Sequence, residues 1–266
     1  MSFFLGVDVG TGSARAGVFD ASGQLLGTQA HAIATYRPQP DFAQQSSADI
    51  WSAVTLAVKG ALAAAGVSGD SIRGIGFDAT CSLVVSGAKD MPISVSPGGE
   101  ADQDVMLWMD HRAIGDAQDI NALGGAPLKH VGGTISPEME LPKLRWLKRE
   151  LPEAWRQALR FWDLPDWLVH RATGGETRSL CSTVCKWTYL GHKGQSGEGW
   201  DDAFLQAIGL EDLATPEHAA IGAELAAPGA PCGGVSARAA AELGVPAGTP
   251  VAASLIDAYA GALGTL

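Results

Sequence analysis

The sequence predicts an α/β fold built from layers of sheet and helix. Three observations support this: three strand-like runs open the chain, a long helical segment follows them, and another apolar strand comes after the helix. Hydrophobic residues make up 46% and charged residues 18% of the 266 positions. The chain is therefore long enough and apolar enough to bury a sizeable core in one large or two modest domains.

The elements of the first third follow from local patterns. The three runs within residues 3–33 are separated by TG and ASGQ, which are hairpin turn chemistries, so they predict an antiparallel meander. The helical segment begins with Ser46 and Asp49 at capping-box spacing and ends at Gly66. Residues 72–78 lack polar alternation, so we expect a strand that is buried on both faces of the sheet.

The remaining elements are expected to be shorter. Residues 86–104 are rich in Gly, Ser, Pro and acidic residues and predict an exposed loop that could be a lid or an edge. Helices are expected over 142–150 and 165–171, in a region dense in tryptophan. Near the end, SARAAAELG predicts a short helix, PVAAS a strand, and DAYAGALGTL the start of another helix.

The charge balance bears on partners and location. Lys and Arg number 18 against 29 Asp and Glu, which gives a formal net charge of -11. A surface of that sign repels phosphate backbones and anionic lipid, so neither nucleic acid nor a membrane is an expected partner. No run approaches twenty apolar residues and the N-terminus has no basic flank or cleavage site, so we expect a cytoplasmic protein.

The four cysteines, Cys81, Cys181, Cys185 and Cys232, are too sparse for a disulfide scaffold, and we interpret them as free thiols. Cys181 and Cys185 are four residues apart and would share one side of a helix. No second pair or nearby histidine would complete a zinc site, so no zinc is expected.

The most informative stretch is GVDVGTGSARAGVFD, in which Asp8 ends an apolar strand and Gly10, Thr11, Gly12 and Ser13 follow. Glycines let backbone N–H groups approach a phosphate, hydroxyls donate to it, and a carboxylate can hold hydrated Mg²⁺. The stretch indicates a phosphate-binding hairpin, with an ordinary Asp-plus-Gly turn as the alternative.

A dinucleotide-binding turn is disfavoured at the same place. Its third small residue would fall at position 15 and open a helix, but Arg15 stands there and strand-like AGVFD follows. A nicotinamide-dependent oxidoreductase is therefore not expected.

A second acidic residue of interest is Asp257, which follows a strand and enters the first turn of an apolar helix. The positive end of the helix would stabilise the ionised carboxylate. A simple helix cap is the alternative. An acidic element at each end of one α/β domain favours a functional interpretation over two unrelated caps.

Taken in order, the motifs GVDVGTGSARAGVFD, DATCSLV, LWMDHRA, SPEMELPKLRWLK, DLPDWLVHRATG, CSTVCKW and IDAYAGALG span essentially the whole chain. The set resembles the N-terminal domain of the FGGY family of carbohydrate kinases, in its branch that phosphorylates ribulose and related five-carbon sugars. The resemblance implies a ribonuclease-H-like domain of the actin and hexokinase type over residues 1–266, with a mixed central sheet flanked by helices.

The resemblance also implies roles for single residues. Asp257 would be the general base and Asp8 the carboxylate beside Mg²⁺. The hairpin that touches the ATP phosphates would be formed by Gly10, Thr11, Gly12, Ser13 and Arg15. Charge on a transferring phosphoryl group needs such donors and a metal more than it needs covalent chemistry.

The positions that match the sugar site are Thr80, Cys81, Ser82, Trp108, Asp110, Arg112, Lys186 and Asp257. Here Asp110 could accept two hydroxyls, Lys186 could donate to a carbonyl or hydroxyl, and Trp108 could cover C–H faces. A core tryptophan, a solvated lysine and a surface ion pair for Arg15 are the alternatives. Asp78 is a further candidate, with local hydrogen bonding in a turn as the alternative.

Family members are normally longer, because a second, C-terminal domain supplies the adenosine pocket. We expect this chain to be the N-terminal half of a kinase that uses ATP to phosphorylate a D-ribulose-like ketopentose or a pentitol at a primary hydroxyl. Alone it should show little or no turnover, since catalysis requires closure around ATP. Xylulose, L-ribulose or glycerol as acceptor, and a non-catalytic sugar- or phosphate-binding module, are the alternatives, and a homodimer stays open.

Overall fold

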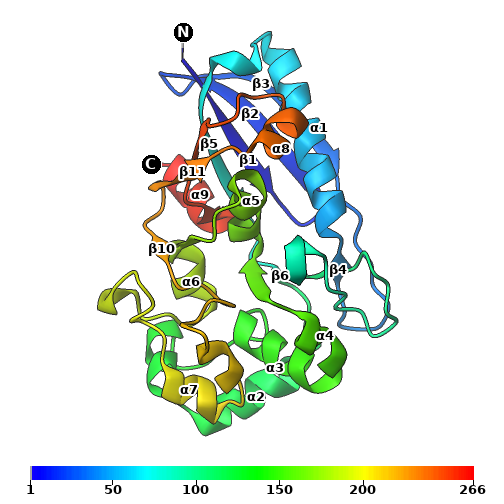
Figure 1. Ribbon diagram of the computed structural model, residues 1–266, viewed down its shortest axis with the longest axis vertical. Coiled ribbons are helices and arrows are strands. Elements are labelled where there is room, and N and C mark those ends of the chain that lie inside the picture. The colour runs from blue at the N-terminus through cyan, green and yellow to red at the C-terminus, as the bar shows by residue number, and fades with distance from the viewer. Residues whose placement is uncertain (1) are drawn as a thin grey trace.

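The structure is a computed structural model that describes residues 2–266 (Figure 1). Its central sheet is mixed, as predicted. The strands of this sheet, in spatial order, are β11 (Pro231–Gly234), β12 (Pro250–Ala252), β5 (Ile72–Ala79), β1 (Phe3–Val9), β2 (Ser13–Asp20) and β3 (Leu25–Ala32), with β13 (Leu255–Ile256) also paired to β5. The meander β1–β2–β3 is antiparallel, whereas β5 runs parallel to β1.

The long helix α1 (Ser47–Ala65) confirms the helix that was predicted after the meander. Ser46 is its N-cap and accepts a hydrogen bond from the Asp49 N–H at 3.3 Å, and Gly66 ends it with φ 63°. The Asp49 carboxylate accepts from the backbone of Ala34 at 2.9 Å, so it ties the helix start to the chain after β3. By length and composition α1 could cross a membrane, but its apolar face packs on β2 and β3, as expected of a core helix.

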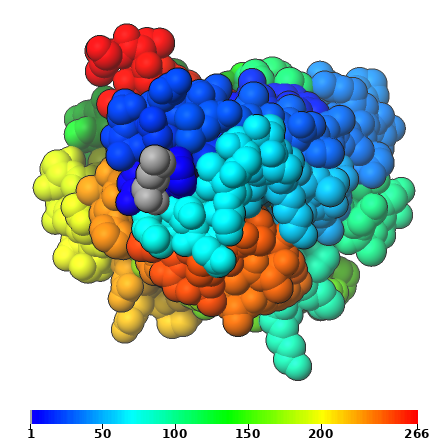
Figure 2. Space-filling model, turned by 90° about the horizontal axis from the view of Figure 1, so that it is seen from above, coloured from blue at the N-terminus to red at the C-terminus, as the bar shows by residue number. Residues whose placement is uncertain are grey.

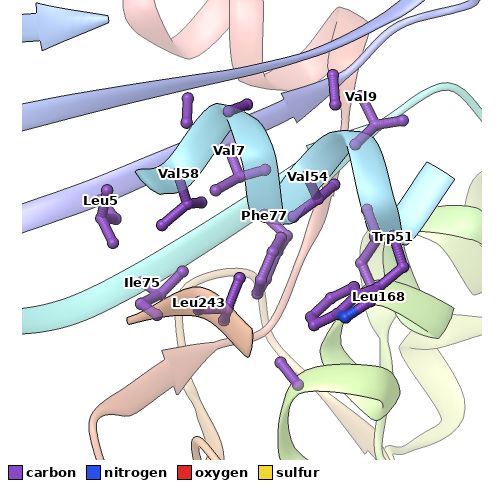
Figure 3. Close-up of a cluster of buried hydrophobic side chains, with 14 of the residues drawn as sticks. Leu5, Val7, Val9, Trp51, Val54, Val58, Ile75, Phe77, Leu168 and Leu243 are labelled. Carbon is purple, nitrogen blue, oxygen red and sulfur yellow. The ribbon is translucent and has the colours of Figure 1, made fainter. Parts of the chain in front are cut away.

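One face of the sheet carries the main core. In Figure 3, Val54 and Val58 of α1 lie over Val7 of β1 and close to Phe77 of β5. The helices α5 (Leu164–Thr173) and α8 (Ala237–Leu243) complete this layer and contribute Leu168 and Leu243 to the same cluster. The predicted helix over 165–171 is thus confirmed, and it packs against the sheet.

The opposite face of the sheet is open, so the expectation that residues 72–78 are buried on both faces is wrong. Arg73 and Gly76 of β5 are exposed, and Phe4 on β1 is 42% exposed. Gly76 is in register with Gly6 of β1. The alternation of buried and exposed residues in β5 could not be recognised in the sequence, because the exposed positions are partly glycines rather than polar residues.

A second body of helices and short strands packs beside the sheet and has its own core (Figure 1). Its strands are β4 (Gln44–Gln45), β6 (Leu83–Ser86), β7 (Val105–Met106) and β8 (Arg160–Asp163), with the separate pair β9 (Arg178–Ser179) and β10 (Leu225–Ala226). Its helices are α2 (Ile114–Leu123), α3 (Glu140–Glu150), α4 (Pro152–Gln157), α6 (Leu180–Lys186) and α7 (Asp202–Ala207). Short 3-10 helices of the chain are η1 (Gly69–Ser71), η2 (Ala88–Asp90), η3 (Ala126–Val131), η4 (Gly191–Lys193) and η5 (Glu211–Ala214).

The last helix, α9 (Asp257–Gly264), begins directly after β13. It has no buried residue, and Figure 2 shows the C-terminal residues projecting from the rest of the surface. The start of α9 therefore lies at the carboxyl end of β5 and β13, while its end points away from the core.

Candidate active site

Three carboxylates gather where strands of the central sheet end. Asp8 and Asp78 are register partners on the parallel strands β1 and β5, so their side chains lie next to each other. β13 pairs with the end of β5, which brings Asp257 at the start of α9 to the same edge. Together with Arg15, these three residues line a cavity of about 510 Å³.

The β1–β2 hairpin places a cation beside this acidic edge. Arg15 Nη2 lies 2.8 Å from Asp8 Oδ2, and the Gly10 N–H donates to the Ser13 carbonyl at 3.0 Å. A Cβ on Gly10 would meet Arg15 Nη2 at 3.0 Å, whereas a Cβ on Gly12 would meet nothing within 4 Å. Gly10 is therefore the glycine whose absent side chain leaves room for Arg15.

Burial and mutual repulsion change the protonation of the strand-end acids. Desolvation, together with the charges of Asp8 and Asp257, raises the pKa of Asp78 to about 7. Desolvation also raises the pKa of Asp8, although Arg15 opposes the shift. The pKa of about 7 makes Asp78 the acid of this edge that can hold a proton near neutral pH.

The donors at this edge fit Mg²⁺ brought in with a nucleotide. Asp8 Oδ1 is buried and has no hydrogen-bond partner. Within residues 2–266, no group of three or more His, Cys, Asp or Glu side chains could hold a metal alone. Mg²⁺ commonly uses one or two carboxylates and takes its other ligands from water and substrate phosphates, so Asp8, with Asp78 beside it, is a suitable protein contribution.

A second cavity, of about 620 Å³, adjoins the first and shares Arg15 and Asp257 with it. Its walls come from the hairpin, the loop after β5, the segment before α3, the end of α6 and the start of α9. The lining residues are Gly10, Thr11, Arg15, Thr80, Cys81, Trp108, Glu138, Cys185, Lys186, Ile256, Asp257, Ala258 and Tyr259. Five predicted sugar-site residues, Thr80, Cys81, Trp108, Lys186 and Asp257, are thus brought to one cavity.

Trp108 is held in place by two hydrogen bonds. Its indole Nε1 donates to Thr11 Oγ1 at 3.0 Å, and its backbone N–H donates to Ser82 Oγ at 3.1 Å. Ser82 itself is fully buried and does not line the cavity, contrary to the prediction. It orients Trp108 instead, and Thr11 links that ring to the β1–β2 hairpin.

Asp110 and Arg112 were also predicted to contact the sugar, but the structure does not bring them to the wall of the cavity. Both side chains are completely buried, and Arg112 Nη2 lies 2.6 Å from Asp110 Oδ2. Asp110 also accepts from the Ala43 N–H at 2.7 Å, and Arg112 donates to the Val95 carbonyl at 2.8 Å. The guanidinium stacks on Phe42, 3.9 Å from the ring centroid. This pair joins three loops and supports the segment that carries Trp108.

The thiols around the cavity differ in character. Burial raises the pKa of Cys81 to about 12, so this thiol is neutral near pH 7. A hydrogen bond from the Cys181 thiol lowers the pKa of Cys185 to about 6 and raises that of Cys181. Cys185 Sγ also contacts the Tyr259 hydroxyl at 3.4 Å. All four cysteines, including Cys232, are free thiols, as predicted.

One protein-family model matches nearly the whole chain. The model of the FGGY family of carbohydrate kinases, N-terminal domain, matches residues 3–264. The chain belongs to this family. An FGGY carbohydrate kinase domain-containing protein of Danio rerio is 48% identical over 266 residues, and a D-ribulokinase of Saccharomyces cerevisiae is 43% identical over 274 residues.

The matches also show how much of each relative is covered. The aligned region is 99% of this chain in both cases, but only 48% of the zebrafish protein and 38% of the yeast protein, so the chain spans half or less of their length. Among solved structures, xylulose kinase from Rhodospirillum rubrum superimposes with a TM-score of 0.81 at 20% identity, over 98% of this chain and 50% of that one. This likeness confirms the predicted actin-like ATPase fold of an FGGY N-terminal domain.

Sequence reasoning missed several cavity residues. Glu138 lines the second cavity and lies 3.5 Å from His111, and Tyr259 and Cys185 stand at the wall formed by α9 and α6. Asp78 was a candidate with local turn bonding as its alternative, and it lies beside Asp8 on the neighbouring parallel strand. The place of Asp78 beside Asp8 could have been found from the sequence, because two parallel neighbouring strands that both carry an Asp near their ends bring the two carboxylates together. Glu138 could not, because it follows a loop whose course is not indicated by any local sequence pattern.

Proposed function

We propose that this chain is the acceptor-binding and base-bearing half of a kinase that uses ATP to phosphorylate a five-carbon sugar. The acceptor would be a D-ribulose-like ketopentose or a pentitol, phosphorylated at a primary hydroxyl. The observation that carries the proposal is the place of Asp257 on the wall shared by the two adjoining cavities. One cavity is lined by carboxylates and Arg15, and the other by hydroxyls, Lys186 and an indole.

Asp257 would act as the general base. It is half-buried, and its Oδ1 accepts a hydrogen bond from the Ala258 N–H at 2.7 Å at the start of α9. A sugar hydroxyl in the larger cavity would pass its proton to this carboxylate as the oxygen attacks the γ-phosphorus from the other side. Such a transfer requires the two substrates to meet at one point, which is what the shared wall provides.

The other residues would bind and orient the reactants. Arg15 and the backbone N–H groups of the hairpin would contact phosphate oxygens, and Asp8, with Asp78 beside it, would hold Mg²⁺ through a carboxylate oxygen. When bound, Mg²⁺ neutralises developing charge on the phosphoryl group. On the acceptor side, Lys186 and Thr80 would donate to hydroxyl or carbonyl oxygens, and Trp108 would cover the C–H face of the sugar.

The choice of a five-carbon acceptor is supported by relatives. The yeast protein that is 43% identical is named a D-ribulokinase, and a protein of Shouchella clausii named ribulokinase is 29% identical over 279 residues. Glycerol kinases of Brucella match at 24–25% identity over a shorter region of 221 residues. The higher identity favours ribulose or a close relative as the acceptor.

The acceptor is tested by calorimetric titration of the chain with D-ribulose, D-xylulose, L-ribulose, ribitol and glycerol. We expect saturable binding of a five-carbon sugar that Lys186→Met weakens at least about tenfold, as for loss of a charged hydrogen bond. Lys59→Met, which changes an exposed lysine on α1, is the matched control and should leave the affinity unchanged. Preference for glycerol, or equal binding by Lys186→Met, would contradict the proposed acceptor or its site.

A further inference from the structure

The two edges of the central sheet differ in how well they are protected against pairing with another strand. At one edge, β11 is four residues long, begins with Pro231 and pairs with β12 in an interrupted register. Short edge strands, prolines, bulges and charged side chains are the features that keep an edge from recruiting a further strand. At the other edge, β3 is eight residues long and contains no proline and no Asp, Glu, Lys or Arg. Apart from a register shift at its start, β3 therefore lacks these features.

The outward-facing backbone groups of β3 follow from its pairing with β2. The Ile33 N–H, directly after β3, donates to the Gly12 carbonyl at 3.0 Å. Hydrogen-bonded pairs alternate along an antiparallel ladder, so every second residue before Ile33 bonds to β2, and the residues between them direct their N–H and C=O groups away from it. These outward residues are Thr28, Ala30 and Ala32. Among residues 2–266, no strand pairs with this side of β3.

The outer side of β3 is also open to solvent. Six of its eight residues are exposed, and Leu25 and Leu26 are 50% and 36% exposed. The Ala30 carbonyl accepts a hydrogen bond from the Gln29 side-chain amide at 3.2 Å, at an exposed position where a neighbouring strand can replace that contact. A second strand therefore has access along the length of the edge.

An uncharged stripe on α1 continues this surface. Leu56 is 49% exposed, and Gly60 and Ala64 follow it at intervals of four residues, so all three lie along one side of the helix. That side lies toward β3, because a Cβ on Gly60 would meet the Gln29 side chain at 2.5 Å. Figure 1 shows α1 beside β3. The edge strand and the stripe therefore form one uncharged surface, the β3–α1 edge.

The occupant that suits the β3–α1 edge is a second copy of the same chain. Antiparallel pairing of a strand with its own copy is self-complementary: a two-fold axis at Ala30 pairs Ala30 with itself and Thr28 with Ala32, and each pair exchanges two N–H···O bonds. Strands in a sheet are about 4.8 Å apart, so the same axis brings the two α1 helices, which lie over β2 and β3, side by side. The small side chains of Gly60 and Ala64 allow such helices to approach closely.

The charge of the chain favours this place for a contact between copies. Each copy carries a formal net charge of -11, so two copies repel where their acidic surfaces meet. β3 has no charged side chain, and α1 has only Asp49 and Lys59. Asp49, at the start of α1, is bonded to the Ala34 backbone. The β3–α1 edge therefore lets two acidic chains meet without bringing carboxylates together.

We propose that two copies of this chain associate through the β3–α1 edge, with β3 paired antiparallel to its counterpart about a two-fold axis at Ala30. The stripes on the two α1 helices then pack against each other, and the two central sheets form one continuous sheet. This association does not rest on the proposed function, because it uses none of the residues that line the two cavities.

The association is measured by sedimentation equilibrium at chain concentrations up to about 100 µM, a range that covers dimers of micromolar affinity. We expect a concentration-dependent rise from the chain mass of 27.4 kDa to twice that value. Added NaCl should lower the dissociation constant, because it screens the repulsion between two acidic chains while the contact itself is uncharged. A chain that stays monomeric, or a dimer that salt weakens, overturns the proposal.

Variants of Ala30 and Leu56 test the contact itself. Ala30→Pro removes an outward N–H and Ala30→Lys places two ammonium groups at the axis, and neither alters the bonds to β2. Each should raise the dissociation constant at least about tenfold, whereas Ala101→Lys, which adds the same charge to an exposed loop, should leave it unchanged. Leu56→Gln should weaken the dimer, and Leu123→Gln, at an exposed leucine of α2, should not. Ala30→Lys keeps the proposal testable if Ala30→Pro fails to fold, and a dimer that withstands Ala30→Lys overturns it.

Amide hydrogen exchange followed by NMR locates the contact within β3. In the dilute chain, the N–H groups of Thr28, Ala30 and Ala32 should exchange fast, because they point away from β2, whereas the His31 N–H is protected by its bond to β2. In the concentrated chain, the three outward groups should exchange at least about tenfold more slowly. If their rates do not depend on concentration while another segment becomes protected, the dimer uses another surface and the proposal is overturned.

Discussion

The buried pair formed by Asp110 and Arg112 allows a quantitative prediction. Asp110 accepts four hydrogen bonds, from the Ala43 N–H, the Arg112 N–H, and Nε and Nη2 of Arg112, and both side chains are completely buried. Asp110→Asn would leave the guanidinium buried without its counter-charge, which costs about 3–5 kcal/mol. Because the whole stability of such a chain is roughly 5–15 kcal/mol, this loss is large.

The assay is urea unfolding followed by tryptophan fluorescence, with the chain's eight tryptophans as reporters. The double variant Asp110→Leu/Arg112→Met should recover most of the loss, because a buried apolar pair needs no compensation. Glu176→Gln, which breaks the partly exposed pair with Arg160, is the control and should cost less than about 1 kcal/mol. If Asp110→Asn costs no more than that control, the supporting role assigned to the pair is wrong.

Three further predictions follow from packing and protonation. Gly27→Ala should destabilise the chain by about 1–3 kcal/mol in urea unfolding, because a Cβ there would lie 2.4 Å from the backbone of α1. Gly12→Ala is the control and should be neutral, because a Cβ there would meet nothing within 4 Å. Equal effects of the two substitutions would contradict the close packing of β3 against α1. Asp78 has a pKa of about 7 in the folded chain and near 3.8 when unfolded, so the folded state binds more protons between these values and the stability contributed by Asp78 falls as the pH rises through that window. Asp78→Asn should therefore flatten the pH dependence of unfolding between about pH 4 and pH 7, and an unchanged slope would refute the raised pKa. Cys185, with a pKa of about 6, should react with iodoacetamide at pH 7 faster than the other thiols, and Cys181→Ser should slow the reaction of Cys185. The labelled peptides are quantified by mass spectrometry. Faster labelling of another cysteine, or an unchanged rate at Cys185 in Cys181→Ser, would contradict the assignment of the thiol pair.

Several elements could be predicted because their signals are local. The meander follows from turn residues between short apolar runs, and α1 follows from a capping residue, a period of 3.6 residues and a terminal glycine. The helix predicted over 142–150 is found as α3, which begins two residues earlier. Backbone preferences and side-chain periodicity act over a few residues, so a single sequence contains them.

The sequence by itself thus determined the strands and helices of the sheet layer, the family resemblance, and the strand-end placement of Asp8 and Asp257. Tertiary structure alone decided which polar side chains face the cavity. Asp110 was expected at the sugar because Asp is a good hydroxyl acceptor, yet Arg112 and a distant loop occupy its oxygens. Glu138 was not expected there and lines the wall. The physical reason is that a carboxylate bonds to whatever donor the fold brings within about 3 Å, and partners far apart in sequence leave no local pattern.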